Sequence, residues 1–287
     1  MNQQIKLRIE AVINNVNQLP SVPDVVAKLL SMVNKEDFSF KDIAHEISKD
    51  QAMTTNILKL CNSAHFSKGN VITSVEKGVV TLGLNEIKEI IMLVAAKPIL
   101  DKSLLGYEME KGALWQQGVV VAETAKRITE LTGRKDVSDT VFTGGIIHNI
   151  GKVVIALFVH NTYAEIMDLV LKDGIPFSQA EHDVMGYSHE EIGERILSKW
   201  NFPQVLKSIV RYYQDPMSAP EEDQYEVSVV HIANVLALMA GIGIGKDGLY
   251  HTIADNAIQK VNLNPNDMGK VFSSIPDIIA KSRELMM

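Results

Sequence analysis

The segment with the clearest capacity for chemistry is Gly144-Gly145-Ile146-Ile147-His148-Asn149-Ile150-Gly151-Lys152, in which an imidazole and an amine stand four residues apart. On a helix this spacing places both side chains on one face. An imidazole can bind a metal ion or transfer a proton, and the neighbouring lysine suits an anionic group. A histidine on an apolar helix is more often a hydrogen-bonded core residue, however, so spacing alone leaves both interpretations open.

Familiar catalytic motifs are missing from the rest of the sequence. It contains neither a Gly-x-Ser-x-Gly nucleophile elbow nor a His-Glu-x-x-His zinc motif. Cys61 is the only cysteine, which excludes an intrachain disulfide and a thiolate metal cluster. It lies in an apolar run without an apparent activating base, so we interpret it as a core residue.

The composition and net charge of the chain limit the kinds of partner that we expect. The 287 residues are 46% hydrophobic and 22% charged, which is typical of a globular protein and excludes intrinsic disorder. The net charge of −7 argues against binding to nucleic acid or to an anionic membrane, so neither partner is expected. The first residues also lack the apolar segment of a signal peptide, and we therefore expect a cytoplasmic protein.

One stretch, residues 227–245, contains no charged residue and needs a test as a membrane span. Ser228, His231 and Asn234 recur in it every three residues, which predicts a polar stripe along one helix face. A span facing lipid would not carry such a stripe without a partner. We therefore expect a buried helix.

The elements that must position these residues are helices, because apolar residues recur at a spacing of 3.6 almost everywhere and period-2 alternation is absent. We expect one helix to stop before Pro98, helices over 138–158 and 161–172, and a last one near 275–285. The polar connection 101–112 is the best candidate boundary. The predicted fold is an all-α, multi-helix bundle in two closely packed lobes. Its expected parts are an N-terminal lobe (1–105), a second lobe (106–215) and C-terminal helices completing the bundle (216–287).

The order His148-Asn149-Ile150-Gly151-Lys152 resembles the His-Asp-x-Gly-Lys signature of the HD-superfamily metal-dependent phosphohydrolases, with Asn149 where Asp belongs. Further segments in order are similar to the HD-related output domain (HDOD) family, a degenerate branch of that superfamily. They are Leu19-Pro20-Ser21-Val22-Pro23, 59–66, 74–83, Trp115-Gln116-Gln117, 186–193, 200–203 and His231-Ile232-Ala233-Asn234. The resemblance implies an HD-domain-like helical bundle with a bacterial signalling or regulatory role.

Catalytic HD enzymes hold their metal with a His, the His-Asp pair and a later Asp. Carried over by position, these ligands fall on Gln117, His148, Asn149 and Asn234, of which only His148 keeps its type. The stretch 211–216 resembles a place where relatives often carry paired histidines, and it has none. Neutral amides compensate none of a divalent ion's charge. The resemblance thus implies no catalytic residue, no metal ligand and no cofactor, or at most a divalent metal at a degenerate site.

The resemblance favours a non-catalytic signalling module whose vestigial pocket is lined by Gln117, His148, Asn149, Lys152 and Asn234. These residues would form either a satisfied polar network or a sensor for a small anionic ligand, bound through Lys152. Signalling proteins are the other expected partners. The alternative is a metal-dependent phosphohydrolase acting on nucleotides or phosphoesters, with substitute ligands such as His189 or Glu190.

A second segment, Asn62-Ser63-Ala64-His65-Phe66, ends a predicted helix and precedes a polar loop. We expect Asn62 and Ser63 to tie down the loop backbone as a structural cap. The functional alternative is that Phe66 and Lys68 are exposed and contact a partner.

Overall fold

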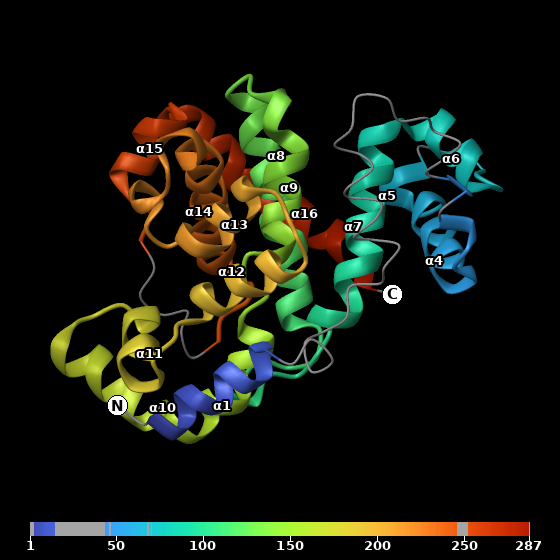
Figure 1. Ribbon diagram of the computed structural model, residues 1–287. Helices are drawn as coiled ribbons and strands as arrows, with labels where there is room; N and C mark the ends of the chain where they lie inside the picture. The colour runs from blue at the N-terminus through green and yellow to red at the C-terminus, as the bar shows by residue number, and fades with distance from the viewer. Residues whose placement is uncertain are drawn as a thin grey trace.

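The computed structural model describes residues 3–14, 44–45, 47–67, 69, 71–245 and 252–286, and within these ranges the chain forms helices and no strand (Figure 1). The expected all-α fold is confirmed. The segment Leu19–Pro23 and Lys68 lie outside the described residues.

The smaller lobe, on the right of Figure 1, is built from α4 (Gln51–Cys61), α5 (Ala64–Ser67), α6 (Val75–Leu82) and α7 (Leu84–Leu100). Two of its helices, α4 and α6, begin at side-chain caps. Asp50 accepts a hydrogen bond from the amide of Met53, and Ser74 accepts one from the amide of Lys77. Such caps satisfy amide groups that have no partner inside the helix. The helices then pack their apolar faces together, α4 against both α6 and α7.

The larger lobe is organised around α8 (Ala113–Leu131), which contacts α7, α9 (Ser138–Ile147), α14 (Gln224–Met239) and α16 (Pro265–Met286). Around them lie the remaining helices. These are α1 (Gln3–Asn14), α10 (Lys152–Asp173), α11 (Phe177–Met185), α12 (His189–Lys199), α13 (Gln204–Tyr212) and α15 (Asp255–Val261).

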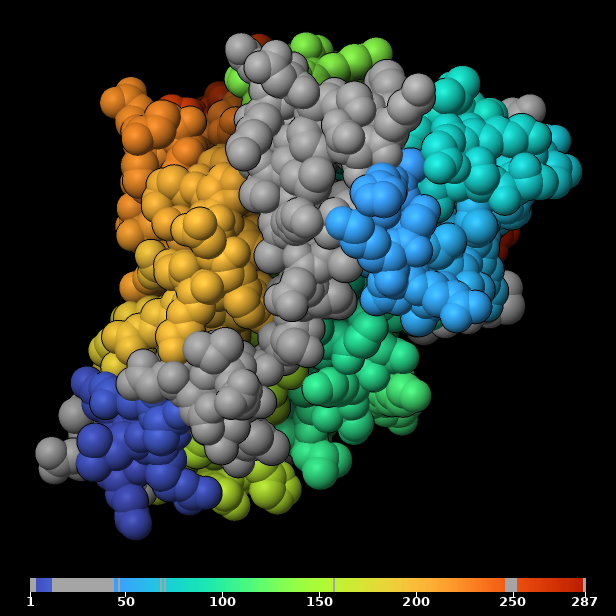
Figure 2. Space-filling model, turned by 45° about the vertical axis from the view of Figure 1, so that its right-hand side comes forward, coloured from blue at the N-terminus to red at the C-terminus, as the bar shows by residue number. Residues whose placement is uncertain are grey.

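The two lobes touch where α7 packs against α8 and α9, and α16 extends from α8 to α5 (Figures 1 and 2). In Figure 2 the residues of α4 and α6, blue to cyan, form the right-hand lobe. The first helix, α1, packs against α10, α11 and α12 in the larger lobe. The division of the chain at residues 105 and 215 stays a prediction.

The prediction of one continuous helix over 138–158 is wrong, because the helix is interrupted in the middle. α9 ends at Ile147, α10 begins at Lys152, and tight turns join them across residues 148–151. Gly151 is required at the break, since a Cβ atom there would lie 1.8 Å from the backbone oxygen of His189. The chain thus leaves the helical path to pack directly against α12. Beyond the break, α10 runs on to Asp173 without the expected interruption near residue 160.

Two further predicted helix boundaries are also wrong, namely the helix end before Pro98 and the start of the last helix near residue 275. α7 continues through Pro98 to Leu100, because Ile99 and Leu100 are both buried in the core and their burial offsets the missing proline amide. The last helix, α16, begins at Pro265, where the fixed backbone of proline suits a first turn.

The uncharged stretch folds as α14, and its residues 227–238 are buried, as expected. Among the described residues no single helix has both the length and the apolar character to cross a bilayer. The bent pair 135–156 and 158–173 meets that test of length and composition only when its two parts are combined.

Candidate functional site

The five residues predicted to line a pocket come from α8, from the break between α9 and α10, and from α14. All are at most 3% exposed. Hydrogen bonds bring Gln117, His148, Asn149 and Asn234 together. Lys152, at the start of α10, lies with its Nζ atom 5.3 Å from the centre of the Tyr107 ring. It does not share a helix face with His148, because the break separates them.

His148 is held in one tautomer. Its Nδ1 atom lies 2.8 Å from the backbone oxygen of Gly145, which can only accept, so Nδ1 carries the proton. Burial lowers the pKa of His148 to about 3, and the ring is therefore neutral at ordinary pH. The lone pair of Nε2 consequently points at the amides of Asn149 and Asn234.

Four contacts close a ring around that lone pair. Asn149 Nδ2 lies 2.8 Å from His148 Nε2 and 3.2 Å from Gln117 Oε1. Gln117 Nε2 lies 3.0 Å from Asn234 Oδ1, which in turn lies 3.2 Å from His148 Nε2. The ring is made of side-chain atoms from three different parts of the chain.

These four contacts cannot all be hydrogen bonds. The Gln117 amide has a donor nitrogen at one end and an acceptor oxygen at the other, so Asn149 and Asn234 must meet it with atoms of opposite type. The same two atoms also face His148, so His148 always meets one donor and one acceptor, whichever way the amides are flipped. One ring nitrogen can match only one of them. Since Nε2 accepts from Asn149, its contact with the Asn234 oxygen joins two acceptors. Both atoms of this contact have another partner, since His148 Nε2 accepts from Asn149 and Asn234 Oδ1 accepts from Gln117. The expectation of a satisfied polar network therefore stays a prediction.

The donor set fits a divalent metal poorly, although the HD pattern implies one. It offers one imidazole and three neutral amides, and none of the four side chains carries a negative charge. Divalent magnesium and manganese bind through carboxylates and give up their water ligands reluctantly. What these residues can do is hold a rigid polar centre at the meeting point of α8, α14 and the break.

A second chain of buried contacts continues from this centre. Tyr213 donates its hydroxyl proton to Asn149 Oδ1 at 2.9 Å, and the same hydroxyl lies 2.9 Å from His189 Nε2. His189 Nδ1 lies 2.6 Å from Glu181 Oε2, and the hydroxyl of Tyr107 donates to Glu181 Oε1. A continuous polar path thus runs from α11 and α12 to the His148 centre.

The surroundings of His189 in this path favour its protonated form. Burial opposes the charge of its imidazolium, but the carboxylates of Glu181 and Glu190 raise the pKa of His189 above its usual value overall. In that form Nδ1 donates to Glu181 and Nε2 can donate to the hydroxyl of Tyr213, which also accepts from the amide of Gln214. The positive charge of Lys152 acts in the opposite direction and lowers the pKa of His189.

Sequence patterns did not single out Glu181 or Tyr107, and Tyr213 drew notice only because relatives often carry histidines nearby. His189 and Glu190 were expected only as substitute metal ligands. Their ligand atoms and those of Glu181 lie within 4.8 Å of one another. The Ser188 capping box, in which Ser188 and Glu191 bond each other's backbone, is the one local signal that fixes where α12 starts.

The expected cap is confirmed for Asn62, whereas the hydroxyl of Ser63 donates to the backbone oxygen of Leu60 in α4 and not to the loop. The side chain of Asn62 donates to the backbone oxygen of Ile72 at 2.7 Å and accepts from the amide of Ile72 at 2.8 Å. Phe66 is buried, so the alternative of an exposed Phe66 contact is wrong. Cys61 is fully buried as expected, and burial raises the pKa of its thiol to about 11.

Comparison with known proteins identifies the fold. The sequence profile of the HDOD domain matches residues 19–216. The chain belongs to the HDOD domain family. An uncharacterized protein of Treponema pallidum is 24% identical to this HDOD protein over 225 residues, which are 78% of this chain and 43% of the relative. The protein YuxH of Bacillus subtilis is 32% identical over 75 residues, 26% of this chain and 18% of the relative. The chain thus spans less than half the length of these curated relatives.

Solved structures of similar fold cover nearly the whole chain. An HDOD domain protein of unknown function from Geobacter sulfurreducens has a TM-score of 0.79 at 24% identity, with 99% of each chain covered. A candidate signal transduction protein from Marinobacter aquaeolei has a TM-score of 0.76 at 15% identity, over 99% of this chain and 66% of that one. A protein from Shewanella amazonensis, by name a candidate metal-dependent phosphohydrolase, has 0.63 at 19% identity, over 98% of both. These likenesses show the fold alone.

Proposed function

We propose that this HDOD domain is a non-catalytic bacterial regulatory module that acts by binding a protein or a small ligand. The observation that carries the proposal is the set of neutral amides at three of the four positions where HD enzymes place metal ligands. Gln117, Asn149 and Asn234 surround the lone pair of His148, and the amide of Asn149 donates to it. The signalling name of a structural neighbour supports the regulatory role.

As part of the same proposal, the domain works in the cytoplasm with signalling proteins or a small ligand as partners. The lone, buried Cys61 supports a reducing compartment. The anionic ligand expected at Lys152 remains a proposal.

The test restores the missing ligands. The variant Gln117→His, Asn149→Asp and Asn234→Asp should bind Mn²⁺ about 10³–10⁶-fold more tightly than the native protein, taking about 10–100-fold for each position. Calorimetric titration measures the affinity, and a phosphatase and phosphodiesterase screen of the native protein with added metal measures turnover. The single variant Gln116→His, one residue away, is the control. Turnover by the native protein that His148→Ala and a chelator both abolish would overturn the proposal.

The second candidate function is a metal-dependent phosphohydrolase, and one observation favours it. Glu181, His189 and Glu190 bring three potential ligand atoms within 4.8 Å of one another beside the degenerate centre. Against it, both oxygens of Glu181 already accept hydrogen bonds, and His189 Nδ1 is one of the donors. If this candidate is right, metal-dependent turnover should disappear in Glu190→Gln and persist in His148→Ala.

A further inference from the structure

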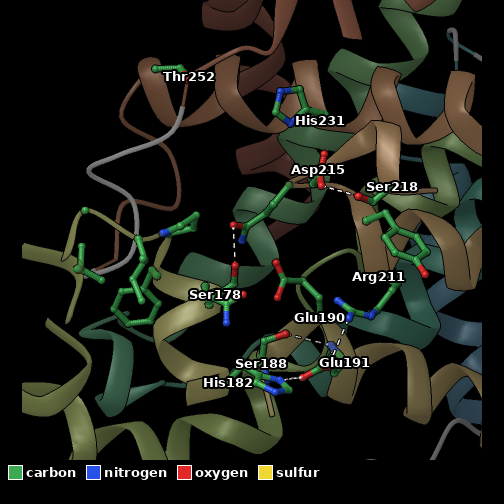
Figure 3. A pocket seen from close by; sticks show the side chains of 18 residues that line it. Ser178, His182, Ser188, Glu190, Glu191, Arg211, Asp215, Ser218, His231 and Thr252 are labelled. Carbon is green, nitrogen blue, oxygen red and sulfur yellow. Dashed lines mark hydrogen bonds and ion pairs between the residues drawn. The ribbon is translucent and has the colours of Figure 1, made fainter. Parts of the chain in front are cut away.

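A cavity of about 640 Å³ lies beside the first turn of α12, between the start of α11 and the end of α13 (Figure 3). This volume is in the range of small-molecule sites. Phe177, Ile175 and Tyr212 provide apolar wall, while Ser178 and Gln214 provide polar groups. None of the five residues of the predicted vestigial pocket lines this cavity.

Glu190 is the unusual member of the lining. Its side chain is 4% exposed, and its Oε2 atom is buried without a hydrogen-bond partner among the described residues. Figure 3 shows its carboxylate in the middle of the cavity, between Ser178 and Arg211. A buried acceptor without a partner costs about 1–3 kcal/mol, and more for a charged group. Such a group calls for a physical explanation.

The other charged groups of the lining are already engaged. Arg211 bonds Glu191 at 3.3 Å, and the ring of His182 contacts the other oxygen of the same carboxylate at 2.7 Å. Asp215 accepts from the hydroxyl of Ser218 at 2.5 Å. The position of Glu190 in the first turn of α12 places its charge in the favourable field of the helix dipole. That field makes the burial tolerable, but it gives Oε2 no donor.

The missing partner must therefore donate hydrogen bonds, and a positive charge suits it best. A carboxylate only accepts, and charge-assisted hydrogen bonds are about twice as strong as neutral ones. A metal ion would find one uncommitted carboxylate here, since Glu181 and His189 hold each other. A protonated amine or guanidinium needs only one carboxylate, and Phe177 and Tyr212 suit an apolar body attached to it.

We propose that this cavity binds a small organic cation, a protonated amine or a guanidinium on an apolar body, through Glu190. The inference rests on the proposed function, because it names the ligand class of a domain that works by binding.

Calorimetric titration of the full chain with phenethylamine tests it, and 2-phenylethanol is the neutral match that differs only in the charged group. The amine should bind more tightly than the alcohol. Glu190→Gln should weaken the amine about tenfold or more, as expected for loss of a charged hydrogen bond. Glu165→Gln, at an exposed position on α10 outside the cavity lining, should leave both affinities unchanged.

Equal binding of amine and alcohol, an unchanged affinity in Glu190→Gln, or no binding of phenethylamine at millimolar concentration would each overturn the inference. So would displacement of the amine by Mn²⁺, which would assign the cavity to a metal. If Glu190→Gln fails to fold, amide chemical shifts of the native protein decide. Shifts induced by phenethylamine at residues 177–178, 188–191 and 211–214 support the site, and shifts confined elsewhere refute it. Turnover of phosphoesters bears on the proposed function alone.

Discussion

His148 should make the stability of the protein depend on pH, and the effect can be isolated by one substitution. The ordinary imidazole pKa is 6.5, whereas burial lowers the pKa of His148 in the folded protein to about 3. Below pH 6.5 the unfolded chain therefore takes up a proton that the folded protein refuses. The free energy of unfolding must fall as the pH falls through this window, and the contribution is fully present only above it.

The magnitude follows from the two pKa values. Between pH 7 and pH 5 the free energy of unfolding should change by roughly 2 kcal/mol through this group. The pH then falls about 1.5 units below the pKa of the unfolded chain, and each such unit is worth about 1.4 kcal/mol. The variant His148→Gln keeps a donor and an acceptor but does not titrate. Between these two pH values its free energy of unfolding should change by about 2 kcal/mol less than that of the wild type, whatever the other groups contribute.

Urea denaturation at pH 7 and at pH 5 measures this difference. The matched control is His160→Gln, at an exposed position, which should retain the pH dependence of the wild type. A difference between His148→Gln and the wild type of less than about 0.5 kcal/mol, near the error of the extrapolation, would refute the reasoning. It would mean that the folded protein protonates His148 readily, and hence that the lone pair is not sealed from water.

Four further outcomes are expected. Burial raises the pKa of Glu89 from 4.5 to about 7, so the carboxyl keeps its proton in the folded protein and the free energy of unfolding falls as the pH rises from about 4.5 to 7. Glu89→Gln should remove up to about 3 kcal/mol of that fall, measured by urea titrations at the two pH values. Gly151→Ala should lower the free energy of unfolding by more than about 3 kcal/mol or prevent folding, because the new Cβ atom would lie 1.8 Å from a backbone atom. Gly269→Ala, where the new Cβ atom meets open space, should raise stability by about 0.5–1 kcal/mol in thermal melts. Phe66→Ala should cost about 3–5 kcal/mol without changing the proteins recovered in a pull-down. Limited proteolysis should not release two stable halves by cutting in residues 101–112, since helices on both sides of that segment pack together.

Much of the helical fold could be predicted because its signals are local. Apolar spacing and the side chains of Asp50, Ser74 and Ser188 mark where helices start, and each of these caps is formed. The break after Ile147 could not be predicted, because the run around it is apolar and helix-like. At this break Gly151 closely approaches α12, and that contact joins residues far apart in the chain.

The candidate site was predictable only as far as the family pattern reaches. The pattern led to Gln117, His148 and Asn234, which do meet. It did not lead to Tyr213 or Glu181, because the role of each depends on one hydrogen bond that no sequence period predicts. Tyr213 bonds Asn149, 64 positions away, and Glu181 bonds His189, 8 positions away. Burial of Glu190 was equally hidden, since an acidic residue in a first helical turn is ordinarily a solvated, dipole-stabilising group.

Asn149 connects these two halves of the site, because both ends of its side-chain amide are hydrogen-bonded. Its amide nitrogen donates to the lone pair of His148, so an N–H group stands where the HD pattern would place a positive charge. Its oxygen accepts from Tyr213, whose hydroxyl in turn accepts from the amide of Gln214. An aspartate at this position could serve Tyr213 but would face the His148 lone pair with a second acceptor. An asparagine at this position therefore suits a neutral His148 on one side and the hydroxyl of Tyr213 on the other.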